Sequence, residues 1–461
     1  MIFVLTIVGL LIYGLGILFS SSWYIASNIH QNAYFFLIKQ SIWTALGLFL
    51  MFILSKIDYK KWKKVAIWLL GVAVISLIAV QFVGIPVSGT RRWFRIGVIG
   101  FQTGELAKFA FMLFLATYFS NLSEEKKNFL KTFLYPFGIF VVLIGLLTLQ
   151  PDLTAVAGLT FVTIFVFYFV GVKKRYILIF ISVLILYITI LFIQRPYYLK
   201  RIYAVLNPSS DSHTSAYQLM QSLIAIGSNG LFGAGFNNSL QKYFYLPGCY
   251  TDTIFSILAE ELGIIGVVVL FIMYLLLIYQ IIRVAKNTEL FGKLLCSGFV
   301  ISVFIPVFAH IASTTGLIPF VSAVLPFVSY SGTSIVFILM SLGIILNISK
   351  SSDGMSCEKT NRANRELNLL FLTILLCFII LLVRVIYIQT IKKPILVSSA
   401  VKMHFIVTKR SFPPDKEVIL QSKEVENLAK GKTERQFYKT VKKNNNYKIL
   451  VRDSRGNIIT K

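Results

Sequence analysis

The feature that most constrains this chain is a series of long apolar runs along most of its length. A run of about twenty apolar residues crosses the hydrocarbon core of a bilayer as an α-helix. Ten runs of about that length precede residue 350, and an eleventh spans 367–390. They lie near residues 2–21, 35–55, 65–83, 104–120, 133–149, 153–172, 176–193, 254–282, 294–314 and 328–348. This pattern predicts an all-α polytopic membrane protein with ten helices and one additional transmembrane helix.

The composition excludes an ordinary soluble protein. Hydrophobic residues make up 56% of the 461 and charged residues only 14%, which is typical of a membrane protein. The net charge is +26, from 45 Lys and Arg against 19 Asp and Glu. The positive residues stand in short clusters between the apolar runs, so they indicate membrane topology and contact with anionic membrane lipids. We expect no nucleic-acid partner.

The basic clusters follow every even-numbered run, and they orient the chain. Cytoplasmic loops carry an excess of Lys and Arg, so the clusters place the N-terminus in the cytoplasm. The first outer loop, Ser22–Ala33, has no Lys or Arg. The clusters are Lys56 to Lys64, Lys126 to Lys131, Lys173 to Arg175, Arg283 to Lys293 and Lys350 to Arg365.

The same runs divide the chain into four parts. Residues 1–350 form a ten-helix membrane domain with a large outer loop at 194–252, and residues 351–366 form a cytoplasmic linker. The additional transmembrane helix spans 367–390, and a basic tail follows at 391–461. Residues 392–461 carry 17 Lys and Arg against six Asp and Glu, a net charge of +11. We expect this tail outside, although a cytoplasmic position would fit the charge bias.

Several cations lie on the outer side, against the topology bias. Arg91 and Arg92 follow the third run, and Arg201 and Lys242 lie in the long outer loop. Anionic phosphate groups are a natural reason for them. The alternative, that long loops translocate regardless of charge, fits the loop better than it fits the arginine pair.

Carboxylates inside or beside the apolar runs are the second unusual feature. Asp252 stands at the start of the eighth run, and Glu260 and Glu261 lie within it. A charge in hydrocarbon must face a cavity or a partner, and the alternative for Asp252 is that it caps the helix. Glu105 and Lys108 are three apart, which lets them pair on one helical face, either at a site or to fix packing. Asp152 either caps the sixth helix or faces the same cavity.

Other motifs add little chemistry. The glycines from Gly227 to Gly235 follow no strand, so they indicate tight turns and close approach to a ligand rather than a dinucleotide fingerprint. The four cysteines and four histidines show no metal-ligand or disulfide spacing. We therefore expect no protein-bound metal.

Five motifs, in order, resemble those of the SEDS family, the shape, elongation, division and sporulation proteins that include RodA and FtsW. Gly89–Trp93 is similar to Gly-Ala-Arg-Arg-Trp, and Leu325–Ser334 is similar to Leu-Pro-Phe-Ile-Ser-Tyr-Gly-Gly-Ser-Ser. The other three are Phe101–Lys108, Gln150–Leu153 and Gln221–Ser228. Departures include Gly248, Tyr250, Thr103, Gly104, Thr154, Val321 and Ser322, where the family carries Glu, His, Pro, Ser, Gly and a Thr-Gly or Lys-Gly pair.

The resemblance implies a SEDS-type bundle in the plasma (inner) membrane of a bacterium. Such a protein polymerises peptidoglycan from lipid II at the outer face of that membrane, in cell elongation, division or sporulation. The resemblance also implies Asp252 as the essential residue and a class B penicillin-binding protein as partner. The candidate substrate-binding residues are Arg91, Arg92, Glu105, Lys108, Asp152, Arg201, Gln221, Ser222, Lys242, Glu260 and Ser329.

The chemistry fits these residue types. Joining two lipid-linked disaccharides requires a base for the acceptor hydroxyl, and a partly desolvated Asp252 suits that role. The leaving lipid diphosphate needs cations, for which Arg91, Arg92 and Arg201 are the candidates, aided by a divalent cation, Mg²⁺ or Mn²⁺, that is held with the diphosphate. No stably bound cofactor is expected.

Two other functions stay open at this point. A lipid II flippase would need a continuous polar path across the helices, whereas the polar groups here cluster in the outer half. A non-catalytic scaffold that recruits wall synthases would fit the departures around Asp252. The stretch Leu382–Gln389 also resembles the membrane anchor of class B penicillin-binding proteins, and the alternative is a generic anchor with a basic tail.

Overall fold

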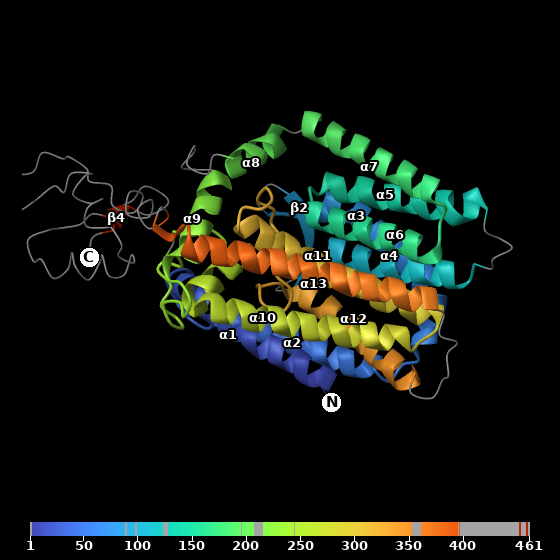
Figure 1. The fold of residues 1–461 in the computed structure, drawn as a ribbon, viewed down its shortest axis with the longest axis horizontal. Coiled ribbons are helices and arrows are strands. Elements are labelled where there is room, and N and C mark those ends of the chain that lie inside the picture. The colour runs from blue at the N-terminus through green and yellow to red at the C-terminus, as the bar shows by residue number, and fades with distance from the viewer. Residues whose placement is uncertain are drawn as a thin grey trace, which may run out of the picture.

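The computed structural model describes residues 2–87, 90–96, 99–122, 128–194, 196–206, 215–243, 245–352, 361–394 and 396, with two short strands at 451–452 and 458–459. The long helices run side by side as an elongated bundle (Figure 1). Most of the tail from residue 397 therefore lies outside the described residues.

The helices are α1 (Ile2–His30), α2 (Phe35–Leu54), α3 (Trp62–Val83), α4 (Thr103–Ser120), α5 (Tyr135–Leu149), α6 (Leu153–Val170), α7 (Lys174–Gln194), α8 (Pro196–Leu206), α9 (Ser215–Ser228), α10 (Ile254–Lys286), α11 (Leu290–Thr314), α12 (Gly332–Ser352) and α13 (Asn361–Thr390). A 3₁₀ turn at Tyr59–Lys61 precedes α3, and a π turn at Leu130–Leu134 precedes α5. The strands are β1 (Ile85–Val87), β2 (Thr90–Ile96), β3 (Ile99–Gln102), β4 (Val451–Arg452) and β5 (Ile458–Ile459).

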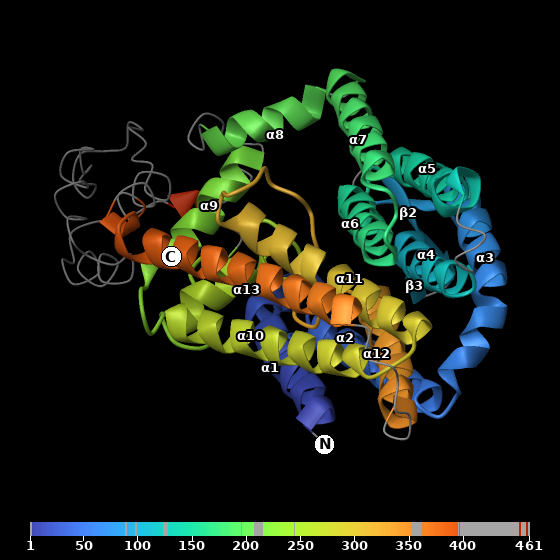
Figure 2. The same cartoon turned by 45° about the vertical axis from the view of Figure 1, so that its right-hand side comes forward.

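Ten helices of the described chain are long and apolar enough to cross a membrane. This confirms the expectation of an all-α polytopic membrane protein. The ten include α13 but not α4, because Glu105 and Lys108 lower the hydropathy of α4. Most residues of α4 are nevertheless buried, and it lies inside the bundle beside α6 and α11 (Figure 2).

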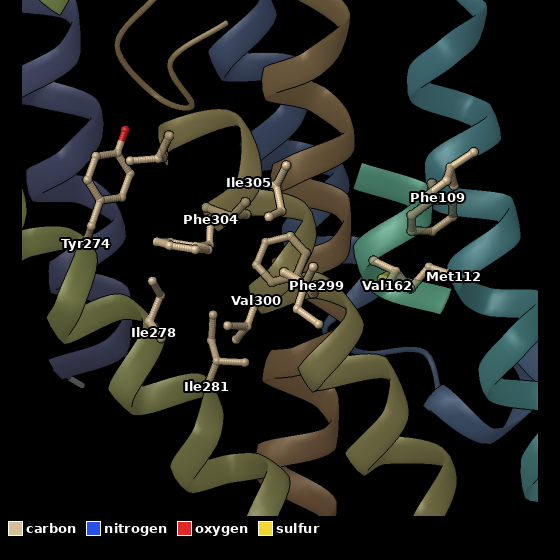
Figure 3. Close-up of a cluster of buried hydrophobic side chains, with 14 of the residues drawn as sticks. Phe109, Met112, Val162, Tyr274, Ile278, Ile281, Phe299, Val300, Phe304 and Ile305 are labelled. Carbon is tan, nitrogen blue, oxygen red and sulfur yellow. The ribbon is translucent and has the colours of Figure 1, made fainter. Parts of the chain in front are cut away.

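Helix α11 lies at the centre of the bundle, and 21 of its 25 residues are buried. Figure 2 shows it between the group α3–α6 and the group α1, α2, α10, α12 and α13. Val300 and Phe304 of α11 face Tyr274 and Ile278 of α10 (Figure 3). On its other side, Gly298 approaches α4 so closely that an added Cβ would lie 2.8 Å from Met112. The two groups therefore pack through α11.

A three-stranded antiparallel sheet, not foreseen from the sequence, joins α3 to α4. Its order is β1-β2-β3, with Trp93 opposite Gln102 and Phe94 opposite Phe101. We call the end of the bundle that holds this sheet and the segments 229–253 and 315–331 the hairpin end. The irregular segments that form the site gather there.

Helix α10 is broken at Gly263, which has φ +63° and ψ −158°. This conformation is essentially restricted to glycine. The glycine-rich segment 230–235 fills the break: Ala234 and Gly235 donate their backbone N–H groups to the carbonyls of Glu260 and Glu261, each at 2.9 Å. The glycines of this segment therefore serve close backbone approach, here to a helix of the same chain.

Helix α13 packs on α10, α9 and α11, as both views show (Figures 1 and 2). Its buried apolar residues follow one another at steps of seven, four, three, four and three, which makes one apolar stripe along the helix. They are Leu367, Ile374, Phe378, Leu381, Val385 and Ile388. At its last turns Arg384 donates to the carbonyl of Thr315 at 3.1 Å, and Gln389 to that of Ala259 at 3.4 Å. Helix α13 is thus an integral part of the bundle.

We predict that Gly263→Ala destabilises the protein. The added Cβ would lie 2.3 Å from the carbonyl oxygen of Leu231, and the backbone strain alone costs roughly 1–3 kcal/mol. The thermal midpoint in detergent should fall by several degrees. The matched control is Gly145→Ala in α5, where an added Cβ meets nothing within 4 Å. Equal midpoints for the two variants would contradict the proposed packing at the break.

Candidate active site

A cavity of about 910 Å³ opens at the hairpin end of the bundle. Polar side chains from many places in the chain converge on it: β2, β3, the start of α4, the start of α6, α8, the loop before α10, the segment 315–331 and the start of α12. They include Arg92, Gln102, Glu105, Lys108, Asp152, Thr154, Arg201, Thr251, Asp252, Ser322, Tyr330, Ser331 and Ser334. Apolar residues of α4, α11 and α12, such as Met112, Phe299 and Phe337, close its deeper part.

Asp252 is half-buried and lines this cavity. Thr253, and not Asp252, occupies the N-cap of α10, and no side chain makes the capping bond there. The capping alternative therefore does not explain Asp252. The turn before it depends on Gly248 at φ +69°, whose carbonyl accepts the N–H groups of Thr251 and Thr253. Glycine replaces the family's Glu at this position, and its conformational freedom suits the tight turn.

The loop that carries Asp252 is fixed by the segment 325–330. Ser329 donates its hydroxyl to the carbonyl of Thr251 at 2.7 Å, and the N–H of Tyr330 donates to the carbonyl of Tyr250 at 3.0 Å. Ser329 is not part of the cavity lining, so it supports the loop from behind. Buried His310 of α11 accepts the N–H of Phe255 at 3.4 Å, which ties down the following helical turn.

Opposing effects act on the pKa of the Asp252 carboxyl. Burial raises the pKa of the Asp252 carboxyl above its ordinary value, whereas a hydrogen bond from Ser322 and the charges of Arg92 and Arg201 lower it. Asp252 lies in the loop before α10, outside the membrane-spanning helices. A carboxylate whose pKa is raised by desolvation is a stronger proton acceptor than one in water.

The arginines of β2 point to opposite faces, as successive residues of a strand do. Arg92 lines the cavity, and its Nε and Nη2 donate to the carbonyls of Gln150 and Pro151 at 2.5 and 2.7 Å. Arg91 is exposed and donates instead to the carbonyls of Gln81 and Phe82 at the end of α3. Of the predicted pair, the structure brings only Arg92 to the cavity, because the strand alternation directs Arg91 away.

Arg201 of α8 also lines the cavity, and its Nη1 donates to the carbonyl of Phe320 at 2.8 Å. It lies far from Arg92 in sequence but beside the same carboxylate. Arg92 and Arg201 thus reach the cavity of Asp252 from two separate elements.

The charged residues of α4 pair as their spacing predicted. Lys108 Nζ lies 2.8 Å from Glu105 Oε1, with side chains 15% and 12% exposed. Both line the cavity. Asp152 does both things that the sequence allowed: it caps α6 by accepting the N–H of Ala155 at 3.1 Å, and it lines the cavity, where it accepts a bond from Gln102.

Lys242, Glu260 and Glu261 form a separate, fully buried cluster and do not line the cavity. Lys242 Nζ lies 3.1 Å from Glu261 Oε1. Burial lowers the pKa of Lys242, while Glu261 raises it. Glu261 also accepts the hydroxyl of Ser20 in α1, and Glu260 accepts the N–H of Leu240 at 2.8 Å. These groups therefore fasten segment 237–242 to α1 and α10.

Gln221 and Ser222 are buried on α9 and are not part of the cavity lining. Helix α9 packs on α10 and α13. Of the predicted substrate-binding residues, the structure thus brings Arg92, Glu105, Lys108, Asp152 and Arg201 to the cavity of Asp252. It places Arg91, Gln221, Ser222, Lys242, Glu260 and Ser329 away from the cavity lining.

Sequence reasoning missed several cavity residues. Thr154 and Ser322 were noted only as departures from family motifs, and Tyr330 only as part of a motif. A single hydroxyl gives no signal of its own without the fold. His310, which supports the loop of Asp252 from α11, was also missed, because it stands at no metal-ligand spacing from another His or Cys in the sequence. Within the described chain no group of three or more His, Cys, Asp or Glu side chains converges as a metal site would require.

Comparisons with known proteins agree with this architecture. Residues 1–354 match the family model FtsW/RodA/SpoVE, described as "Cell cycle protein". The chain is 34% identical over 356 residues to "Probable peptidoglycan glycosyltransferase FtsW" of Coxiella burnetii (strain RSA 493 / Nine Mile phase I), covering 76% of this chain and 96% of that protein. It is 34% identical over 349 residues to "Stage V sporulation protein E" of Bacillus subtilis (strain 168), covering 74% and 94%.

Solved structures with a similar fold include the rod shape determining protein RodA of Thermus thermophilus, with a TM-score of 0.56 and 26% identity over 76% of this chain and 96% of that one. A chain of a structure described as "Structural coordination of polymerization and crosslinking by a peptidoglycan synthase complex" gives a TM-score of 0.62 and 29% identity, covering 77% and 98%. The family match ends at residue 354, so α13 lies beyond it.

We predict that the pair Glu105–Lys108 stabilises the bundle as a unit. Glu105→Gln or Lys108→Met strands a charge and should cost roughly 3–5 kcal/mol, measured as thermal unfolding in detergent. The swap Glu105→Lys with Lys108→Glu should recover much of that loss. The exposed pair Lys60–Glu289, also at 2.8 Å, is the control, since breaking it should cost less than about 1 kcal/mol. A swap no more stable than the single variants would disprove the pairing.

Proposed function

We propose that this chain, which belongs to the FtsW, RodA and SpoVE family of cell cycle proteins, is a peptidoglycan glycosyltransferase that polymerises lipid II in the Asp252 cavity. One observation carries the proposal: a half-buried carboxylate faces a cavity that also presents Arg92 and Arg201. This is the arrangement that glycosyl transfer from a lipid diphosphate requires, a base on one side and cations on the other. The members compared here include proteins named as peptidoglycan glycosyltransferases.

In this mechanism Asp252 is the general base. The hydroxyl of the acceptor sugar attacks the anomeric carbon of the donor, and the carboxylate of Asp252 takes its proton. The C–O bond to the donor's diphosphate breaks, and that group leaves as an anion. The backbone bonds from Ser329 and Tyr330 hold the loop of Asp252 in place during the reaction.

Arg92 and Arg201 stabilise the leaving diphosphate. Backbone carbonyls fix both guanidinium groups before substrate arrives, so they need little reorganisation as charge develops. A guanidinium has five N–H donors, and Gln150 and Pro151 use two of those on Arg92. We propose that any divalent cation, Mg²⁺ or Mn²⁺, enters with the diphosphate, because the described residues offer no ligand cluster of their own.

The depth of the cavity favours polymerisation over transport. Along α4 and α12 the cavity lining ends at Met112 and Ser341, each nine residues from the hairpin-end start of its helix, and along α11 it ends at Phe299, fifteen residues from Thr314. At 1.5 Å per residue these depths are about 14 Å and about 22 Å, so the cavity stops short of the roughly 30 Å of the hydrocarbon core. A flippase would need a polar path through the remaining depth as well.

We propose that the N-terminus is cytoplasmic and that the hairpin end faces outward. The loops at the opposite end carry the basic clusters, such as Lys60 to Lys64 and Lys173 to Arg175, as cytoplasmic loops do. The protein is a multi-pass inner membrane protein, and this orientation puts Asp252 at the face where glycan strands are assembled.

The position of α13 is consistent with a partner synthase of the class B penicillin-binding type. Its last turns reach the hairpin end, where Ile388 and Leu396 lie against Gly227 of α9. A segment that continues from α13 would therefore begin beside the loop that leads to Asp252. We propose that the tail 391–461 lies outside and forms part of the contact with such a partner.

We predict that Asp252→Asn abolishes polymerisation while the protein stays folded. The amide keeps the shape but cannot accept the proton, so the rate should fall by about 10²–10⁴-fold. The measurement is glycan synthesis from labelled lipid II by purified protein, with and without its partner synthase. The control is Asp58→Asn, where asparagine still caps the turn Tyr59–Lys61 that Asp58 caps.

The pH dependence follows from the same carboxylate. Because burial raises the pKa of Asp252 and the base must be ionised, the rate should rise with pH through a pKa above the ordinary Asp value of about 3.9. Near-normal synthesis by the Asp252→Asn variant would refute the assignment. Absence of synthesis by the unaltered protein with its partner would favour the scaffold.

We predict that the tail is exposed outside. Asn445→Cys, in the part of the tail outside the described residues, should react with a membrane-impermeant thiol reagent in intact protoplasts. The native cysteines require controls: Cys249 and Cys296 are buried and Cys377 lies within α13. The fourth, Cys357, lies in the linker outside the described residues, and the parent protein reports the background of all four before and after lysis. Labelling of Asn445→Cys only after lysis would place the tail in the cytoplasm.

A further inference from the structure

The segment 320–323 is held in place by side chains from three helices. Arg201 of α8 donates to the carbonyl of Phe320 at 2.8 Å, and Thr154 of α6 donates to the carbonyl of Ser322 at 3.3 Å. His310 of α11 contacts the carbonyl of Ala323 through Nδ1 at 2.7 Å. This geometry requires the Nδ1–H tautomer, in which Nε2 is free to accept the N–H of Phe255. Three of four successive carbonyls are therefore fixed from outside the segment.

This support fixes the backbone from which the Ser322 side chain extends. Ser322 and Asp252 line the same cavity, and a hydrogen bond from the Ser322 side chain is the first of the influences that lower the pKa of the Asp252 carboxyl. His310 contacts both sides of this pair, since it bonds the backbone at Phe255, after Asp252, and at Ala323, after Ser322. His310 therefore joins the two loops from behind, in addition to the bonds from Ser329 and Tyr330.

The charged and titratable groups around Asp252 come from several elements. β2 presents Arg92, α8 presents Arg201, and the neighbouring loops present Tyr250 and Tyr330, while α4 and α6 contribute Glu105, Lys108 and Asp152 to the same cavity. Both arginines will also be engaged by an anionic substrate. Ser322 is the neutral donor on Asp252, so its effect persists when the arginines bind diphosphate.

We propose that Ser322 is a positioning residue for Asp252, and that Thr154 orients Ser322 through its carbonyl. The inference rests on the proposed function, in which Asp252 is the base. The serine hydroxyl donates to the ionised carboxylate, which keeps the base deprotonated in a desolvated site and aims its other oxygen at the acceptor hydroxyl.

The test is the pH profile of polymerisation by the Ser322→Ala variant. Loss of a donor to the ionised form raises the pKa of Asp252, so the acid limb of the rate should move up by about one pH unit. The rate at acidic pH should then fall about tenfold while the rate at alkaline pH changes little. Ser322→Thr, which keeps the hydroxyl, should restore the parent profile.

Thr154→Val removes the supporting hydroxyl at nearly constant volume. It should shift the acid limb in the same direction by a smaller amount, and it should add little to Ser322→Ala, because the two groups act in one chain of contacts. The control is Ser182→Ala on the exposed face of α7, whose hydroxyl bonds only to the carbonyl of Leu178 in its own helix. Its profile should match the parent.

The outcomes separate this inference from the proposed function. If Asp252→Asn is inactive and Ser322→Ala keeps the parent acid limb, the positioning role is wrong and the base assignment stands. If Asp252→Asn is active, the proposed function itself fails. If Ser322→Ala folds but is inactive at every pH, the profile of Thr154→Val decides, and an unshifted acid limb there overturns the inference.

Discussion

The rest of the structure depends on the requirement that polar groups inside a bilayer find partners within the protein. At Gly263 the helical bonding of α10 is interrupted, and segment 230–235 supplies N–H donors to the carbonyls that face it. The buried carboxylates of Glu260 and Glu261 then accept bonds from Ser20, Ser239 and Lys242. A single break thereby gathers α1, α10 and the long segment after α9 into one unit. That unit supports the loop that carries Asp252.

The same requirement separates the polar groups of the site from those of the scaffold. Lys242 and Glu261 have side chains that are entirely buried and compensate each other, so they have no capacity for an incoming anion. Arg92 and Arg201 donate to backbone carbonyls and lie at the cavity. Glu105 and Lys108 pair at its wall. The charges that line the cavity balance in number, with Arg92, Lys108 and Arg201 against three carboxylates, and Arg92 and Arg201 are the two cations that act on Asp252.

Helix α13 extends this arrangement beyond the part of the chain that matches the family. Its apolar stripe is buried against α10 and α11, and its opposite face exposes large apolar residues such as Leu372 and Leu376, as a helix at the edge of a membrane bundle does. Its polar contacts, from Arg384 to Thr315 and from Gln389 to Ala259, fall at the hairpin end. The helix is therefore joined most specifically to the region next to the site, and only by packing elsewhere.

The sequence by itself determined the membrane class, the positions of the long helices, the pairing of Glu105 with Lys108 and the candidacy of Asp252. Each depends on local properties: run length, helical spacing, or the cost of a charge in an apolar run. Only the tertiary structure decided that Arg92 and not Arg91 faces the cavity, that Lys242 and Glu260 belong to the scaffold, and that α4 is stabilised despite its charges. It also decided that Ser322 lines the cavity of Asp252 and that His310 joins the backbone at Phe255 to the backbone at Ala323. Those outcomes depend on contacts between residues far apart in the chain, such as Arg201 with Phe320 and Ser20 with Glu261, which no local pattern encodes.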